Sequence, residues 1–114
     1  MSELQNEIKS IEVHMKDAIE KVQLGDDLAA LMKNRAFKRL ITERYFKDEP
    51  ARLVMLKACP NAQSDDVQKE IEKDITAIGG LFQFFCAIEG EANAMRHAIE
   101  SDKQMIEALE AEDE

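Results

Sequence analysis

The sequence predicts an all-α protein, and two observations carry this prediction. The 114 residues include only two prolines and four glycines, which are the main helix breakers, and aromatic residues make up 5 %. Apolar residues recur at steps of three and four, the spacing of one helix face. We therefore expect one domain, residues 1–114, with a long C-terminal helix and shorter N-terminal helices packed antiparallel on it. Helix should cover about 75–85 % of the residues, well above the usual third.

Residues 4–24 are predicted to form the first helix. Its apolar residues alternate steps of four and three in a heptad pattern, at Leu4, Ile8, Ile11, Met15, Ala18 and Val22. We expect Gly25 to end or bend this helix and Asp26 to start a short one that reaches residue 33. Because an isolated helix of this length is marginal in water, it needs a partner.

Residues 26–58 are predicted to form short basic helices. Asn34 is the expected N-cap of a helix over 35–47. Asp48-Glu49-Pro50 should start another over 50–58, because proline is favoured in a first helical turn. The side chains expected to face inward are Phe37, Leu40, Ile41, Tyr45, Leu53, Val54 and Leu56. Cys59-Pro60-Asn61 should close the segment.

Residues 64–112 are predicted to form one long helix, about 70 Å in length at the usual rise per residue. Ser64 is its expected cap, and Asp65 and Asp66 suit the positive end of the dipole. Gly79-Gly80 would cost roughly 2 kcal/mol inside a helix relative to alanine. We expect close approach of another backbone, or a kink, to compensate.

The far end of this helix repeats the heptad spacing of the first helix, at Ala92, Met95, Ile99, Asp102, Ile106 and Leu109. Segments 4–22 and 92–109 are therefore expected to pair antiparallel as coiled-coil-like arms. Both arms are acidic, so pairing between chains is an alternative to pairing within one. Asp102 is the polar residue of the seam, and we expect it either at a wet, frayed end or facing a lysine such as Lys9.

Charge is strongly polarised along the chain, whose net charge is −9. Residues 33–57 carry eight basic and three acidic residues, whereas both flanking parts are acidic. The candidate partner-binding cations are Arg35, Lys38, Arg39 and Arg44. They could bind phosphates, with Asn34 and Tyr45 nearby, or balance acidic arms of this chain or a neighbour. We favour balance, because the total charge opposes non-specific DNA binding.

A second candidate contact lies around Phe84. Phe82 and Phe85 fit the predicted core stripe of the long helix, whereas Phe84 points elsewhere with Leu81 and Ile88 beside it. A helix that is apolar most of the way round is buried on several sides. Phe84 and Ile88 are therefore predicted partner-binding residues. We expect a homo-oligomer, with a dimer through the long helices favoured, since two-fold pairing is the commonest closed solution.

No catalytic, cofactor-binding or metal site is predicted, and we do not expect an enzyme. The chain has no GxxxxGK[ST], no GxGxxG and no metal spacing such as HxxxH or ExxH. His14 and His97 are expected at the surface, and Cys59 and Cys86 as reduced thiols. No signal peptide or bilayer-length apolar run is present, so no membrane association is expected.

The middle of the chain resembles a group of small, uncharacterised proteins of tailed bacteriophages, encoded among virion-assembly genes. The similarity covers about residues 25–90 and centres on KNxxFKxxIxExYFxxExxRLVxLKA, here Lys33 to Ala58. Group members have glycine before the tyrosine, where this chain has Arg44. The resemblance implies a phage source and a role in particle structure or assembly, and it transfers no catalytic residue.

The expected function is therefore that of a phage structural or assembly protein. It would act through contacts with itself and with other phage structural proteins, as a scaffold, minor capsid or head-tail assembly component. It would be found in the host cytoplasm or in the virion. One alternative is an acidic inhibitor of a host nucleic-acid enzyme, for which a single continuous carboxylate stripe would argue. Another is a small DNA-packaging subunit that binds nucleic acid through residues 33–57.

Overall fold

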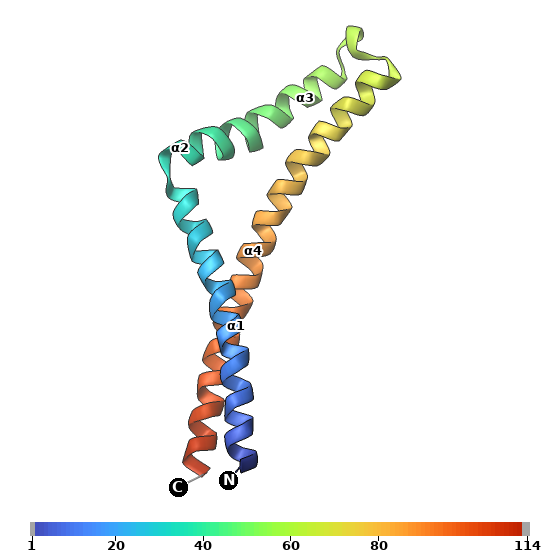
Figure 1. Cartoon of the computed structure of the whole chain (residues 1–114). Helices are drawn as coiled ribbons and strands as arrows, with labels where there is room; N and C mark the ends of the chain where they lie inside the picture. Colours follow the sequence, from blue (N-terminus) through green and yellow to red (C-terminus); the bar gives the residue numbers. More distant parts are fainter. Residues whose placement is uncertain (1, 113–114) are drawn as a thin grey trace. The chain divides into compact units, whose positions relative to one another are not determined.

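A computed structural model describes residues 2–112, of which 95 % are helical and none is in a strand. The elements in order are α1 (Ser2–Lys33), α2 (Arg35–Phe37), η1 (Lys38–Asp48), α3 (Glu49–Lys57), η2 (Pro60–Ala62) and α4 (Asp65–Glu112) (Figure 1). The predicted all-α fold is confirmed, including the long C-terminal helix with shorter N-terminal helices packed against it. The helical share exceeds the expected range.

The residues group into two compact units. The first comprises Met1–Leu28 and Ala87–Glu114, described over residues 2–28 and 87–112, and the second comprises Ala29–Cys86. The first unit is made by the N-terminal part of α1 and the C-terminal part of α4. The second is made by the end of α1, by α2, η1, α3 and η2, and by the first part of α4.

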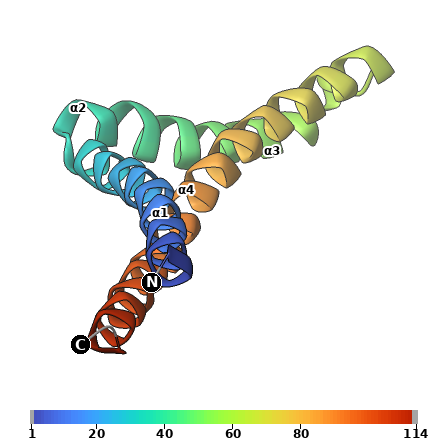
Figure 2. The ribbon, with the colours of Figure 1, turned by 60° about the horizontal axis from the view of Figure 1, so that its bottom comes forward.

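In the first unit the two predicted arms pair within one chain. The N-terminal part of α1 and the C-terminal part of α4 run side by side in opposite directions (Figures 1 and 2). The heptad positions of both arms are half-buried or buried, and Ala18 and Ala92 are each 1 % exposed. Two ion pairs link the flanks, Lys21 Nζ to Glu91 Oε1 and Arg96 Nη2 to Asp26 Oδ1, both at 2.8 Å.

Gly25 does not end the first helix, and the predicted separate helix from Asp26 to residue 33 is wrong. Helix α1 continues through Gly25 with ordinary helical backbone to Lys33. The packed side of α1 continues as well, since Gly25 and Leu28 are buried. A Cβ on Gly25 would overlap the Cβ of Ala92, so the glycine allows the two helices to approach closely. Its role is in packing and not in termination.

Asp102 lies on the seam, as its heptad position predicts, but neither expected environment is found. Its side chain is half-buried, and Oδ2 is buried without a hydrogen-bond partner among residues 2–112. Lys9 is exposed and forms no ion pair with Asp102 within this part of the chain.

In the second unit residues 35–57 form one uninterrupted helical rod. The predicted helix over 50–58 is present as α3, with Pro50 in its first turn, but no break in the helix precedes it. Asn34 caps the rod as expected, since its Oδ1 accepts a hydrogen bond from the Phe37 N–H at 3.0 Å. Residues 38–48 adopt π-helical geometry, and the Glu49 N–H bonds to the Arg44 carbonyl five residues earlier. Proline lacks an N–H and its ring crowds the carbonyl four residues back, so a wider turn directly before Pro50 relieves that contact.

The wider turns change which side chains face α4. A π-helix needs more than four residues per turn, so inward positions recur at Phe37, Ile41 and Tyr45 and are joined by Phe46. Leu40 and Val54, both expected inward, are instead 63 % and 58 % exposed. Leu53 is 1 % exposed and forms the core with three residues of the turn and of α4, which are Ala62, Ile71 and Ile78.

Two glutamines fix the turn between α3 and α4. The Gln63 side-chain amide donates to the carbonyls of Lys57 at 3.0 Å and Cys59 at 2.7 Å. The Gln68 amide donates to the carbonyls of Lys57 at 3.0 Å and Ala62 at 2.8 Å. These bonds satisfy carbonyls that the end of a helix and a 3₁₀ turn would leave open.

Helix α4 begins as predicted, with Ser64 Oγ accepting a hydrogen bond from the Val67 N–H at 3.3 Å. Its inward seam takes steps of four and three from Ile71 to Ile78, then changes phase at Gly79-Gly80 and resumes at Leu81. The expected close backbone approach at these glycines is wrong. Apart from the helix's own backbone, no described atom lies within 4 Å of a Cβ built on either glycine. The phase change also leaves Phe82, predicted to be core, 47 % exposed.

Candidate protein-interaction surfaces

Four exposed cations on α2 and η1 form the first candidate surface, named the basic surface: Arg35, Lys38, Arg39 and Arg44. None of the four forms an ion pair among the described residues of the second unit. By contrast, Arg52 pairs with Glu49, and Lys57 Nζ lies 3.2 Å from Glu72 Oε1. Within its own unit, the basic surface therefore keeps its charge available for a partner.

Tyr45 does not extend the basic surface in the way a nucleic-acid site would need. Its ring is half-buried and packs on Phe46, with ring centroids 5.8 Å apart. Asn34 is likewise engaged, as the cap of α2. Asn34, Tyr45 and the four cations suggested contacts with phosphates or bases. Only the four cations are exposed and form no ion pair within this unit.

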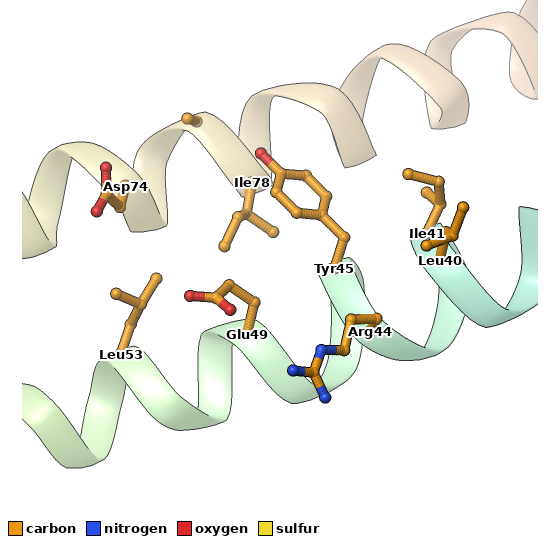
Figure 3. Close-up of a pocket in the computed structure, with 9 residues that line it drawn as sticks. Leu40, Ile41, Arg44, Tyr45, Glu49, Leu53, Asp74 and Ile78 are labelled. Atoms are coloured by element: carbon orange, nitrogen blue, oxygen red, sulfur yellow. The ribbon is translucent and has the colours of Figure 1, made fainter.

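An open groove of about 550 Å³ separates η1 and the start of α3 from α4. Ile41, Tyr45 and Leu53 project from the η1–α3 side, and Ile78 projects towards them from α4 (Figure 3). Arg44 and Glu49 lie along one wall and Asp74 along the other. A smaller hollow of about 360 Å³ shares Leu53 and Asp74 and extends along Arg52, Leu56, Asp66, Val67, Glu70 and Ile71. The lining is mainly apolar with charges at the edges.

An aromatic cluster holds η1 against α4. The Phe46 ring meets Phe82 edge-on, with centroids 5.4 Å apart and planes at 89°. Phe46 also lies 5.9 Å from Phe85, and Phe37 lies 6.0 Å from Phe85. Since aromatic pairs at these distances are favourable, the cluster fixes the position of η1 and its cations relative to this part of α4.

Phe84 is the predicted contact residue that the structure leaves most open on α4, with 59 % of its area exposed. Ile88, one turn further along, is half-buried and belongs to the inward seam, as does Leu81. Other large apolar side chains of the second unit are exposed as well. Seven large hydrophobic side chains of residues 29–86 are exposed, against four buried hydrophobic residues, so a partner has apolar surface to cover.

The electrostatics of the groove wall centre on Glu49. A hydrogen bond from Arg52, with the attraction of its charge, holds the pKa of the Glu49 carboxyl below its ordinary value. The same contact raises the pKa of Arg52. In the first unit, the hydrogen bond to Glu91 raises the pKa of Lys21. These shifts come from ion pairs at the surface and indicate structural contacts.

The described residues contain no group of three or more histidine, cysteine, aspartate or glutamate side chains placed to hold a metal ion. His14 and His97 are exposed, Cys59 is half-buried and Cys86 is exposed, and both thiols are free. Over residues 2–112, no helix combines the length and the apolar character needed to cross a membrane.

The sequence predicted that the cations and Phe84 lie on exposed faces, as they do, but it did not predict the groove. The groove depends on the π-helical register of η1, which places Ile41 and Tyr45 opposite Ile78 and moves Leu40 to the rim. A continuous period near four over residues 37–53, wider than an α-helix, was the available signal. Comparison with protein-family models, with curated proteins and with solved structures gave no match to the chain.

Proposed function

We propose that the chain is a non-enzymatic phage structural or assembly protein that acts through protein–protein contacts. Its partners are a second copy of itself and other phage structural proteins, in the role of scaffold, minor capsid or head-tail assembly component. Its place is the host cytoplasm during assembly or the virion. The phage assignment rests on the resemblance of residues 33–58.

The observation that carries the protein-contact part is the set of large apolar side chains that the second unit leaves exposed. Phe84, Leu40 and Val54 each expose more than half of their area, although the buried core of this unit is small. Exposed apolar patches of this kind mark contact surfaces in soluble proteins. The basic surface of the same unit supplies charge that would orient an acidic partner.

The distribution of acids supports an assembly role over an inhibitor that imitates DNA. The acidic residues of α1 are exposed and lie on both flanks of its seam and on its outer face: Glu3, Glu7, Glu12, Asp17, Glu20, Asp26 and Asp27. An imitation of the phosphate backbone would need one continuous carboxylate stripe. Acids spread over all exposed sides provide solubility instead.

Light scattering with and without duplex DNA tests this proposal. We expect a mass well above the 13.0 kDa of one chain, unchanged by DNA. A monomer that gains mass with DNA would refute it.

Nucleic-acid binding is the second candidate, because the basic surface has no ion pair within its own unit. Arg35→Glu with Arg39→Glu reverses two of its charges without touching the packed face of η1. On the main proposal, this double variant loses association with protein and has little DNA affinity to lose. Salt-sensitive, micromolar duplex binding by the wild type that the variant abolishes would favour the packaging role instead.

A further inference from the structure

The α4 wall of the groove and of the adjoining smaller hollow carries a row of acids, named the acidic row: Asp66, Glu70 and Asp74. The three are spaced by four residues on one α-helix, so they lie on one side of it. All three are exposed, and none forms an ion pair among the residues of the second unit. Arg52 lines the same hollow but donates its hydrogen bonds to Glu49. Because like charges at this spacing repel each other, the acidic row favours an occupant that brings positive charge.

Apolar side chains line the groove and the smaller hollow along the same length. Leu53 and Ile78 project between the two helices (Figure 3), and Val67 and Ile71 line the smaller hollow. The α4 wall from Asp66 to Ala77 is about 16 Å long at the usual rise per residue, which is three helical turns. A helical segment that carries apolar residues flanked by cations over this length would fit both the apolar lining and the acidic row.

We propose that the groove binds the basic surface of a second copy of this chain. Leu40 supplies the apolar contact, and the cations lie against the acidic row. The basic surface has the required composition, since Leu40 is 63 % exposed among Arg35, Lys38, Arg39 and Arg44. The inference rests on the proposed function, because it specifies how one of the proposed partners is bound.

The two halves of this contact lie at opposite ends of the same groove. Leu40 and Arg44 line one end, with Ala77 on the α4 side (Figure 3). Asp66 and Glu70 line the smaller hollow, which continues the groove at the other end. A two-fold axis between the two ends therefore places each basic surface on the acidic row of the other copy. The two contacts form together, as in other isologous dimers.

Phe84 extends this surface at the Leu40 end. It follows Ala77 by seven residues, which is about two turns, so the two side chains leave α4 in nearly the same direction. Phe84 is 59 % exposed and belongs to the second unit, as do Leu40 and Ala77. A second copy that covers this end of the groove is therefore placed to cover Phe84 as well.

A charge exchange tests the contact. Glu70→Lys with Asp74→Lys reverses the acidic row, and Arg35→Glu with Arg39→Glu reverses the basic surface. Each double variant alone should self-associate on the order of tenfold more weakly than the wild type. In an equal mixture, the reversed row meets the reversed surface and the unchanged row meets the unchanged surface. The mixture should therefore recover wild-type association, and sedimentation velocity gives the dissociation constants.

Two matched double variants control for net charge. Glu43→Lys with Asp48→Lys, and Lys47→Glu with Lys69→Glu, make the same changes in charge at exposed residues of the second unit that line neither hollow. Both should associate as the wild type does. Circular dichroism checks that every variant stays helical. If the reversed acidic row prevents folding, Glu70→Gln with Asp74→Asn makes the same comparison with a smaller change.

A truncation at Leu40 tests the apolar half of the contact. Leu40→Ala should weaken self-association on the order of tenfold, because the leucine side chain is then missing from the groove of the other copy. Val54→Ala is the control, since Val54 is 58 % exposed in the same unit but lines neither hollow. Equal association of the two variants would contradict the placement of Leu40 in the groove.

The outcomes separate this inference from the proposed function. If the wild type self-associates and only reversal of the basic surface weakens it, the cations bind another surface, such as the acidic arms, and the inference is overturned. A mixture that fails to recover also overturns it, and both results leave self-association intact. A wild type that stays monomeric at micromolar concentration overturns this contact and the proposed self-contact together. Loss in both double variants with recovery in the mixture supports the inference.

Discussion

Gly25 and Gly79 are both helical residues, but only Gly25 faces a packed neighbour. A Cβ on Gly25 would overlap Ala92, whereas one on Gly79 meets no described atom within 4 Å outside its own helix backbone. Gly25→Ala should therefore lower the free energy of unfolding by about 1–3 kcal/mol through overpacking. Gly79→Ala should raise it by about 1 kcal/mol through helix propensity. Urea titrations of both variants measure the two values, and equal signs would contradict the close packing of α1 on α4.

Asp102 interrupts an otherwise apolar seam in the first unit. Its Oδ2 is buried without a hydrogen-bond partner among the described residues. Asp102→Leu removes this unsatisfied group and completes the heptad, so it should stabilise the chain by about 1–3 kcal/mol. Thermal unfolding of Asp102→Leu measures this stabilisation. Asp113→Leu is the control, because it changes the charge equally at a position outside the described residues. A destabilised Asp102→Leu would indicate that the carboxylate has a partner in solution.

At the scale of elements, the α3–α4 turn depends on Gln68. Its amide donates to the carbonyls of Lys57 and Ala62, and Gln63 supplies a second donor to Lys57. Gln68→Leu should cost about 1–2 kcal/mol, because two carbonyls lose a donor that water replaces poorly in a half-buried position. Gln104→Leu, at an exposed position of the same helix, is the control. Equal unfolding midpoints for the two variants would show that the turn does not need the amide.

The start of α3 should respond to acid through Glu49. Its pKa is lowered in the folded chain, so the stabilisation from its pair with Arg52 is present above the ordinary glutamate pKa of about 4.3. It is lost as the pH falls through the lower, folded value. The wild type should therefore lose more stability than Glu49→Gln over this acid range. Unfolding curves at several pH values measure the difference, and parallel losses would place Glu49 outside the ion pair.

The elements also show what the sequence allowed us to predict and what it did not. Heptad spacing predicted both arms and their antiparallel pairing, although it left open whether they pair within one chain or between two. The cap at Ser64 was predicted from the chemistry of its side chain and of the acids that follow it. The sequence misplaced the end of α1 and suggested a break before α3, because Gly25 serves helix packing and Pro50 follows a continuous, wider helix. Leu40, Val54 and Phe82 were assigned inward because an ideal 3.6-residue period was assumed across a π-helix and a change of phase.

For the whole molecule, the candidate site was predictable in part. The cations of the basic surface and Phe84 followed from composition and helix angle alone. The groove required three-dimensional positions, since it depends on how η1 and α3 pack on α4 and has no sequence motif. The cations and Phe84 have one property in common. Their charge and their apolar area have no partner within the second unit.

The central claim is that this chain acts by binding protein, first of all a second copy of itself. Sedimentation of the wild type over a micromolar concentration series at physiological salt tests it most directly, with Phe84→Ala and Phe82→Ala measured beside it. We expect twice the 13.0 kDa chain mass for the wild type and for Phe82→Ala, and a shift towards one chain for Phe84→Ala. A wild type that sediments as a 13.0 kDa monomer throughout the series would contradict the claim.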